Sequence, residues 1–369
     1  MSVRVRLRWP QIAGAMGEGM TQTPDQELAA LVDVAALEKY LNEHLEGPPT
    51  PIEVKKHTAG YSNVTLFINR GEQRLVMRRP PTGNLLPSAH DVVREYRFMT
   101  AVQGKARVAR PLVCCEDTSV IGAPFYVMER VNGTEIRETI PEAYDNPEGR
   151  RKMAEEMIDA LVELHAVDWQ AAGLTAPPGS YIERQLRRWQ RQWELTRERT
   201  RELPGLDRVS QWLQDHMPEQ SETTIAHGDY KMDNVLFSFE EPKLLAILDW
   251  ELATIGDPLA DLGWLQSSWG DRKQLEADQA AGIEPPTPLP ATLKEGFPDV
   301  DELAELYAEK SGRSIKNLRF YRLLAMFKGA VIGEGIYMRY LEGNVTNPQG
   351  ARMKEQVPLR VERMLQLID

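Results

Sequence analysis

Residues 225–237 read Ile-Ala-His-Gly-Asp-Tyr-Lys-Met-Asp-Asn-Val-Leu-Phe, and residues 246–251 read Ala-Ile-Leu-Asp-Trp-Glu. Short apolar runs flank the polar residues of both segments, which predicts buried strands at 225–226, 235–237 and 244–248. The polar side chains between and directly after these runs include His227, Asp229, Lys231, Asn234 and Asp249. Mg²⁺ bound to phosphates takes carboxylate and amide oxygens as ligands, so the pattern favours a metal–phosphate site. The alternative is that the two aspartates and the asparagine are turn residues that cap the strands.

The spacing of these residues matches a template for phosphoryl transfer. Kinases carry a His-Arg-Asp-x-x-x-x-Asn segment, with the Asp near the acceptor hydroxyl and the Asn on Mg²⁺, followed by a second Asp on Mg²⁺ at the end of a strand. Asp229 and Asn234 keep that gap, and Asp249 ends the next predicted strand. Lys231 lies two residues after Asp229, where a cation would face the transferred phosphoryl group. The order and the strand context therefore predict a kinase-like site.

Two departures from the protein-kinase pattern point to a family. Gly228 replaces the Arg, and Trp250-Glu251 replaces Phe-Gly, so the segments read His-Gly-Asp and Asp-Trp-Glu. With these segments the chain resembles the aminoglycoside phosphotransferase and choline kinase family of small-molecule kinases. The resemblance implies ATP- and Mg²⁺-dependent transfer and an α+β, bilobal, protein-kinase-like fold, with a β-rich N-lobe carrying one main helix and a mainly helical C-lobe. The roles expected are catalytic for Asp229 and Lys231, metal-binding for Asn234 and Asp249, and structural support for His227 and Asp261.

The composition limits the possible partners. The 369 residues suggest two domains or one bilobal enzyme, and the net charge of −11 argues against general binding of nucleic acid or anionic membranes. No run of about 18 apolar residues exists, so no membrane span is expected. The adjacent Cys114 and Cys115 predict reduced thiols and a cytoplasmic location. Residues 1–24 lack the apolar region of a secretory signal and are expected to be a flexible leader, with Met20 as a second possible start.

Residues 25–128 are predicted to form the N-lobe. A helix is expected at 25–46, followed by strands at 52–57, 64–69 and 73–78, the last two joined as a hairpin. The turn Ala59-Gly60-Tyr61-Ser62-Asn63 lies where a kinase places its phosphate-covering loop, and Ser62 and Asn63 are candidates to cover phosphates. A plain turn is the alternative interpretation.

The third predicted strand ends at Arg78, where the kinase fold carries its phosphate-binding Lys. A guanidinium can hold two phosphate oxygens, so Arg78 is the expected nucleotide ligand, and Arg79 is the candidate if the register is shifted by one. A helix is predicted at 89–103, with Asp91 as its cap and Glu95 as the carboxylate that orients Arg78. The alternative for Glu95 is a solvated helix face.

Two further apolar segments complete the expected N-lobe. Residues 108–121 predict a pair of strands, and residues 125–130 predict a buried strand followed by a turn. In a bilobal kinase that turn is the hinge, here 129–133, where backbone groups near Glu129 and Val131 would pair with an adenine. The remaining residues, 134–369, would then form the C-lobe.

The C-lobe is expected to be built from helices joined by loops. Periodic apolar residues predict helices at 148–167, 181–201, 205–217, 300–310, 315–341 and 350–367. Asp257-Pro258 is expected to open another helix, with Asp261 one turn in, where related folds brace the catalytic loop. The Pro- and Gly-rich residues 271–298 predict a loop. His165 is interpreted as a core or capping histidine.

The predicted helix 181–201 is unusually basic. Arg184, Arg187, Arg188 and Arg191 recur on one face, with Trp189 and Trp193 on another. Either the arginines form a solvated face, or they form a cationic wall for an anionic substrate such as an acyl-CoA or a carboxylate. Their charge argues against a polycationic aminoglycoside.

The resemblance extends over about residues 30–342 and is strongest to the phosphotransferase-like proteins related to the kinase half of fused acyl-CoA dehydrogenases. It depends on Gly60-Tyr61-Ser62-Asn63, Met77-Arg78-Arg79-Pro80-Pro81, Ala89-His90-Asp91 with Arg94-Glu95-Tyr96, Tyr181-Ile182-Glu183-Arg184-Gln185 and Gly333-Glu334-Gly335-Ile336-Tyr337. Nothing in the chain resembles a flavin-binding dehydrogenase.

The function expected is phosphorylation of a small-molecule hydroxyl by Mg-ATP, with a hydroxy acid or hydroxyacyl-CoA as acceptor. One alternative is a nucleotide- or acyl-CoA-binding module without turnover, which the replacement of Lys by Arg78 favours. Another is an aminoglycoside or amino-alcohol kinase. A protein kinase is disfavoured, because the Gly-rich loop and an Ala-Pro-Glu segment are both missing from the sequence. The oligomeric state is left open.

Overall fold

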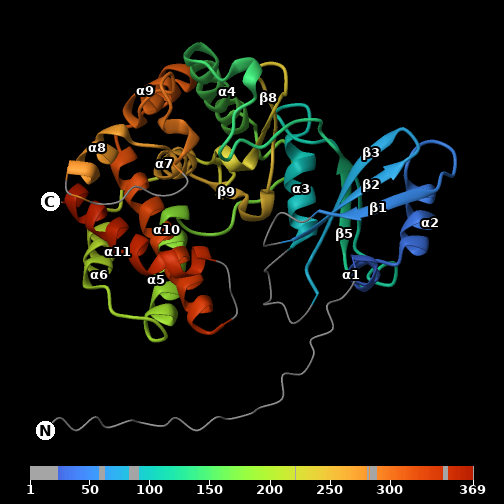
Figure 1. The fold of residues 1–369 in the computed structure, drawn as a ribbon, viewed down its shortest axis with the longest axis horizontal. Helices are drawn as coiled ribbons and strands as arrows, with labels where there is room; N and C mark the ends of the chain where they lie inside the picture. The colour runs from blue at the N-terminus through green and yellow to red at the C-terminus, as the bar shows by residue number, and fades with distance from the viewer. Residues whose placement is uncertain are drawn as a thin grey trace, which may run out of the picture.

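The computed structural model describes residues 24–57, 63–82, 91–220, 222–280, 282, 289–343 and 348–368. The chain forms two lobes, with a twisted sheet on one side and a larger group of helices on the other (Figure 1). The predicted bilobal α+β fold class is therefore confirmed. The predicted leader lies almost entirely outside the described residues, and the boundaries proposed for the lobes and the hinge stay predictions.

The N-lobe is built on a five-stranded antiparallel sheet in the order β1-β2-β3-β5-β4. The positive φ of Gly71 (+56°) shapes the tight turn of the predicted β2–β3 hairpin. The bounds of the strands are β1 Ile52–Lys56, β2 Val64–Arg70, β3 Gln73–Arg79, β4 Pro111–Cys115 and β5 Phe125–Glu129.

Alternate residues of β3 and β5 serve two different cores, because successive side chains of a strand point to opposite faces. Leu75 and Val127 pack with helix α2 (Val34–His44) on the outer face. Val76 and Tyr126 pack on the other face, which helix α3 (Val92–Val102) covers on the side of the C-lobe (Figure 1). The sheet is thus joined to the main core of the molecule through α3.

Two predictions for the N-lobe are wrong in detail. The helix expected at 25–46 is two helices, α1 (Pro24–Leu31) and α2, because the carboxylate of Asp33 accepts a hydrogen bond from the Ala36 N–H (3.0 Å) and starts a new helix. The strand pair expected at 108–121 is the single strand β4, because Asp117 forms a turn by accepting from the Ser119 N–H (2.9 Å). In contrast, Asp91 caps α3 as predicted, accepting from the Arg94 N–H at 3.0 Å.

Helix α10 is the centre of the C-lobe, where it packs against α5, α6, α7 and α11. It is almost wholly apolar over its middle turns, as expected for a helix surrounded by others. In the described part of the chain, no helix is long and apolar enough to cross a membrane. The helices are α4 Pro147–His165, α5 Tyr181–Arg197, α6 Pro204–Asp215, α7 Pro258–Ser268, α8 Arg272–Ala280, α9 Val300–Ser311, α10 Leu318–Leu341 and α11 Pro348–Ile368.

The loop predicted at 271–298 is wrong for its first third, which forms α8. Asp271 accepts from the Gln274 N–H (3.1 Å) at the start of this helix, and the Gln274 amide bonds Asp278 one turn later (2.8 Å). The prolines and glycines that suggested a loop all follow this helix. The short 3-10 helix η4 (Ala291–Leu293) comes later in the same segment; 3-10 helix η1 (Glu142–Tyr144) lies before α4.

Four short strands hold the polar segments of the C-lobe. Strands β6 (Thr224–Ala226) and β9 (Thr254–Gly256) pair with each other, and so do β7 (Val235–Phe237) and β8 (Leu244–Ile247). The apolar runs around the polar residues thus form strands, as predicted. Helices η2 (Met232–Asn234) and η3 (Trp250–Leu252) immediately adjoin β7 and the end of β8.

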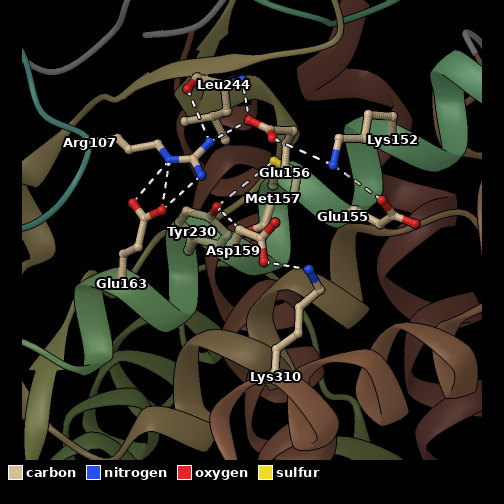
Figure 2. A network of polar contacts seen from close by, with 10 residues as sticks. All are labelled: Arg107, Lys152, Glu155, Glu156, Met157, Asp159, Glu163, Tyr230, Leu244 and Lys310. Carbon is tan, nitrogen blue, oxygen red and sulfur yellow. Dashed lines mark hydrogen bonds and ion pairs between the residues drawn. The ribbon is translucent and has the colours of Figure 1, made fainter.

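Arg107, which follows α3, ties this region to α4 (Figure 2). Its guanidinium binds Glu156 (2.5 Å) and Glu163 (2.8 Å) of α4 and the Leu244 carbonyl of β8 (3.2 Å). The backbone continues the junction, because the Ile247 N–H donates to the Arg107 carbonyl at 2.8 Å. The linker from the N-lobe helix, the C-lobe helix α4 and the strand that leads to Asp249 are therefore fastened at one point.

Candidate active site

A cleft of about 780 Å³ lies between the two lobes. Arg78 of β3 and Asn63 line its N-lobe side, and Asn234 and Asp249 line its C-lobe side. The predicted hinge residues Glu129 and Val131 line its edge. Ser62, the other candidate for covering phosphates, lies outside the described residues. The structure thus gathers most of the predicted nucleotide and metal residues around one cavity.

Asp229, Lys231 and Asn234 form a compact cluster in the loop between β6 and β7. The Asn234 amide Nδ2 donates both to the Asp229 carboxylate Oδ2 (2.6 Å) and to the Asp229 carbonyl (2.9 Å). Lys231 Nζ lies 3.3 Å from the same Oδ2. The carboxylate is therefore oriented by an amide and partly neutralised by an ammonium group, while 17% of its side chain stays accessible.

Asp261 of α7 holds the backbone of this loop. Its two carboxylate oxygens accept from the N–H groups of His227 (2.6 Å) and Gly228 (2.7 Å), and from His165 Nε2 (3.2 Å). Burial favours the neutral acid, but the hydrogen bonds and the histidine charges outweigh it and keep the pKa of Asp261 below its usual value. The geometry matches the bracing expected from the sequence. His165 is part of the core, as predicted.

A second set of contacts joins this loop to the end of β8. His227 Nε2 donates to the Leu248 carbonyl (2.8 Å), and the Leu248 N–H donates to the Asn234 carbonyl (2.8 Å). Asp249 follows with φ +62° and ψ +63°, a left-handed conformation that is uncommon for residues other than glycine. Strain of this kind gathers at functional sites, and here it turns the Asp249 side chain out of the strand next to the catalytic loop. Asn234 and Asp249 consequently line the same cavity.

Arg78 links the N-lobe helix to this aspartate. Its guanidinium lies 3.0 Å from Asp249 Oδ1 and 3.3 Å from Glu95 Oε2. Glu95 is almost fully buried and also accepts from the Tyr126 hydroxyl (2.9 Å) and the Asn63 amide. Burial raises the pKa of Glu95, and the charge of Arg78 and the Tyr126 hydrogen bond act against that shift. The alternative cation, Arg79, instead donates to the carbonyls of Leu31 and Pro80.

The oxygen donors fit a Mg²⁺ ion that is carried by a nucleotide. In the described residues no group of three or more His, Cys, Asp and Glu side chains could hold a metal alone. Mg²⁺ commonly binds through one or two protein ligands together with substrate phosphates. Asn234 uses its Nδ2 in hydrogen bonds to Asp229, which leaves its Oδ1 as a ligand, and Asp249 supplies a carboxylate.

The two hinge candidates, Glu129 and Val131, differ in whether their backbone N–H groups already make hydrogen bonds. The Glu129 N–H donates to the Arg110 carbonyl (2.9 Å), and its carboxylate pairs with the Arg110 guanidinium. The next N–H, that of Arg130, donates to the Arg74 carbonyl (2.8 Å). Within the described ranges the Val131 N–H has no such partner, so Val131 is the better candidate for contact with a nucleotide base.

The four arginines of α5 do not act as one wall. Arg184 donates to the carbonyls of Pro177, Pro178 and Gly179 before the helix, and Arg187, Arg188 and Arg191 are all exposed. Arg188 lines a second cavity, which is also lined by Gly228 of the loop between β6 and β7. The buried tryptophans of α5 lie on its opposite, inner face, as the helical spacing predicts.

Sequence reasoning missed three residues around the site. Lys328 of α10 donates to the Gly228 carbonyl (2.6 Å), and Trp264 of α7 lies under its ammonium group. Arg94 of α3 donates to the carbonyls of Glu251 (3.1 Å) and Ala253. Arg94 enters the resemblance only as part of the segment Arg94-Glu95-Tyr96, and the sequence predicts no role for it, for Lys328 or for Trp264. A cation within the apolar stretch 323–333 was the one available signal for Lys328.

Gly228 cannot be enlarged without moving the loop between β6 and β7. Its φ is +81°, and an added Cβ would lie 2.7 Å from the Leu252 carbonyl oxygen. We expect Gly228→Ala to lower kcat by about 100-fold, because a shift of about 1 Å in a catalytic group has effects of that size. Gly104→Ala is the matched control, since Gly104 also has a positive φ (+72°) but nothing within 4 Å of an added Cβ. The control should lose about 1 kcal/mol of stability and keep its kcat, and equal kcat for both variants would contradict the expectation.

Comparison with known proteins relates both the sequence and the fold of the chain to phosphotransferases. The model of the phosphotransferase enzyme family matches residues 53–295. A solved structure from Ralstonia eutropha, classed with the aminoglycoside phosphotransferases, is 33% identical, with a TM-score of 0.75 over 91% of this chain and 99% of that one. A thermostable aminoglycoside phosphotransferase, solved with ADP and hygromycin B, has a TM-score of 0.53 at 15% identity over 90% of this chain and 98% of its own, a likeness of fold alone.

Among curated proteins, acyl-CoA dehydrogenase family member 10 of Mus musculus is 36% identical over 331 residues, or 87% of this chain. Those residues make up 30% of the mouse protein. The chain spans less than half of the length of the curated relatives it matches, including the family member 11 of Rattus norvegicus, of which it covers 43% at 33% identity.

Proposed function

Because the chain belongs to the phosphotransferase enzyme family, we propose that it transfers a phosphoryl group from Mg-ATP to a hydroxyl group of a small molecule. One observation carries the proposal: Asn234 and Asp249 line a single interlobe cleft, and the amide of Asn234 is hydrogen-bonded to the carboxylate of Asp229. The nucleotide would occupy that cleft. The acceptor would approach Asp229 from the C-lobe.

Each side chain has a distinct task in this reaction. Asp229 accepts the proton of the acceptor hydroxyl, and the Asn234 amide keeps its carboxylate oriented. Lys231 stabilises negative charge on the transferred group. Arg78, held by Glu95, would bind phosphate oxygens. Asn234 and Asp249 would hold a Mg²⁺ ion, which would neutralise phosphate charge. Most of the catalysis is then positioning and electrostatics.

The acceptor proposed is a hydroxy acid or a hydroxyacyl-CoA. Arg188 at the second cavity supports an acceptor that carries negative charge or oxygen acceptors, rather than a polycationic aminoglycoside or an amino alcohol. The acyl-CoA dehydrogenase names of the curated relatives agree with acyl chemistry.

A second candidate function is binding of a nucleotide or acyl-CoA without turnover. It is favoured by the ion pair between Arg78 and Asp249, in which the cation occupies one oxygen of a metal ligand. In this reading the pair persists when the nucleotide binds, and no metal reaches Asp249.

An acceptor screen that reads ADP release separates the two candidates. The acceptors would be hydroxy acids, hydroxyacyl-CoA esters, amino alcohols and aminoglycosides, each with Mg-ATP. We expect release with the first two classes and not with the others. Thermal stabilisation by Mg-ATP combined with no release for any acceptor would support the non-catalytic module and reject the proposed transfer.

A further inference from the structure

Lys328 is a cation on the acceptor side of the catalytic loop that the mechanism above does not use. Its Nζ donates to the carbonyl of Gly228, the residue before Asp229, at 2.6 Å. The same Nζ lies 3.8 Å from the ring centroid of Trp264 and 5.8 Å from that of Trp189. An ammonium group has three N–H donors, and in the described part of the chain only the Gly228 carbonyl accepts one. The other N–H donors are therefore left for the face of Trp264 and for a ligand.

These donors belong to a small cavity of about 40 Å³. A cavity of this kind needs about 10–15 Å³ to hold one water molecule, so this one can hold a group with a few heavy atoms, such as a carbonyl or a carboxylate. The cavity and the nucleotide cleft share no lining residue. Gly228 lines the cavity and Asn234 lines the cleft, and Asp229 lies between them in the loop. A group in the cavity would thus be attached to a molecule that reaches Asp229 from the side away from the nucleotide.

The polar groups at this cavity are mainly donors. Trp264 lines it, and the buried indole Nε1 of Trp264 has no hydrogen-bond partner in the residues the structure describes. Arg188 adds a guanidinium at the rim. Burial lowers the pKa of Lys328 to about 8 against the attraction of Asp229 and Asp261, so the ammonium form still predominates at pH 7. A buried donor without a partner is unfavourable, and an oxygen acceptor from a ligand would satisfy it.

We propose that Lys328 and Trp264 form a subsite that binds a carbonyl or carboxylate oxygen of the acceptor and so places its hydroxyl at Asp229. This inference rests on the proposed function and assigns the residues that select the acceptor. The oxygen could belong to the free carboxylate of a hydroxy acid or to the thioester of a hydroxyacyl-CoA, which share the same hydrogen-bonding chemistry. Aminoglycosides, with ammonium groups, would be repelled by Lys328 and Arg188.

The test compares Lys328→Met with Lys316→Met. Both variants remove one positive charge, and Lys316 is exposed in the loop before α10. Steady-state kinetics would use hydroxy acids, hydroxyacyl-CoA esters and diols of the same chain length. Lys328→Met should raise the acceptor KM by about 10- to 100-fold for the first two classes, the size of a lost charge-assisted hydrogen bond. Its KM for the diols and for ATP should stay within about twofold, and Lys316→Met should match the wild type.

A binding measurement keeps the test independent of turnover. Calorimetric titration would use straight-chain carboxylates from butyrate to decanoate and the corresponding acyl-CoA esters, which lack the hydroxyl. Loss of carboxylate binding in Lys328→Met identifies a carboxylate as the bound group, and loss of ester binding identifies the thioester. Trp264→Phe, which keeps an aromatic ring beside Lys328 but removes the indole N–H together with the rest of the pyrrole ring, should weaken binding of the same ligand several-fold.

The outcomes are distinguishable from failure of the proposed function. If no ADP is released with any acceptor but Lys328→Met loses ligand binding, the result supports the subsite and rejects the proposed phosphoryl transfer. If the wild type binds none of these ligands, or if Lys328→Met binds them as well as Lys316→Met does, the subsite is overturned. Stabilisation by Mg-ATP in every variant checks that each is folded.

Discussion

The Asp229→Asn variant is expected to lower kcat by about 10²- to 10⁴-fold, the contribution that a positioned general base makes. The substitution removes the basic carboxylate and keeps the shape of the side chain, whose remaining oxygen can still accept from the Asn234 amide. The affinity for Mg-ATP should change by less than about threefold, because the nucleotide cleft is lined by other residues.

Single-turnover phosphoryl transfer and a separate titration with Mg-ATP measure these two quantities. The matched control is Asp215→Asn, which removes the same charge from an exposed position at the end of α6. The control should keep the turnover of the wild type. Undiminished turnover in Asp229→Asn would remove Asp229 from the mechanism.

The Arg78→Met variant is expected to lose both nucleotide affinity and stability. Glu95 is 1% exposed and would keep its hydrogen bonds from Tyr126 and Asn63, but it would lose its countercharge. Removal of one partner of a buried ion pair lowers the free energy of unfolding by about 3–5 kcal/mol. The matched control is Arg74→Met on the same strand, where the exposed guanidinium donates, among the described residues, to the carbonyls of Gly71 and Gln73. Denaturant unfolding and Mg-ATP titration measure the two effects.

The same variant should depend on pH in a defined direction. Burial already raises the pKa of Glu95, and loss of Arg78 raises it further. The folded state then binds a proton more readily than the unfolded state, so the contribution of Glu95 to stability is fully present below the unfolded pKa of Glu, about 4.3, and is lost as the pH rises from there through the raised folded pKa. Unfolding curves from pH 5 to pH 8 would show this loss, which should be smaller in the wild type.

The double variant Arg78→Met with Glu95→Gln separates charge from packing. An amide at position 95 needs no countercharge, so most of the lost stability should return. The nucleotide affinity should not return, because the phosphate-binding guanidinium is still missing. Recovery of affinity in the double variant would show that Arg78 acts only as the partner of Glu95.

The sequence predicted the central site because its residues lie close together along the chain. Asp229, Lys231 and Asn234 share one loop, and the strands on either side follow from short apolar runs. Arg78 and Glu95 are farther apart in the sequence. Their positions, at the end of a predicted strand and near the start of a predicted helix, suggested that they pair as in the family's pattern, and the two side chains do form an ion pair. Local spacing and element ends were sufficient for this part.

The rest depends on contacts between distant segments. Lys328 and Gly228 are 100 positions apart in the sequence, and their hydrogen bond depends on how the helices pack. The helix of Lys328 was predicted to be largely buried, and nothing in the sequence indicated which group would bind the lysine. Conversely, the spacing of the α5 arginines suggested that they bind one anionic substrate together. Arg184 instead donates to the backbone carbonyls just before the helix. The break between α1 and α2 was missed because the apolar period continues across Val32 and Asp33, and only the side-chain cap reveals it.

The hydrogen bonds from Arg94 to the carbonyls of Glu251 and Ala253 restrict the movement of α3. Arg94 sits one residue before Glu95, so the helix that carries the buried carboxylate is fastened to the segment just after Asp249. A helix fastened in this way cannot swing outward to disconnect Arg78 without breaking those bonds. Any such movement would cost the free energy of both hydrogen bonds, so they favour the arrangement in which Glu95, Arg78 and Asp249 are in contact.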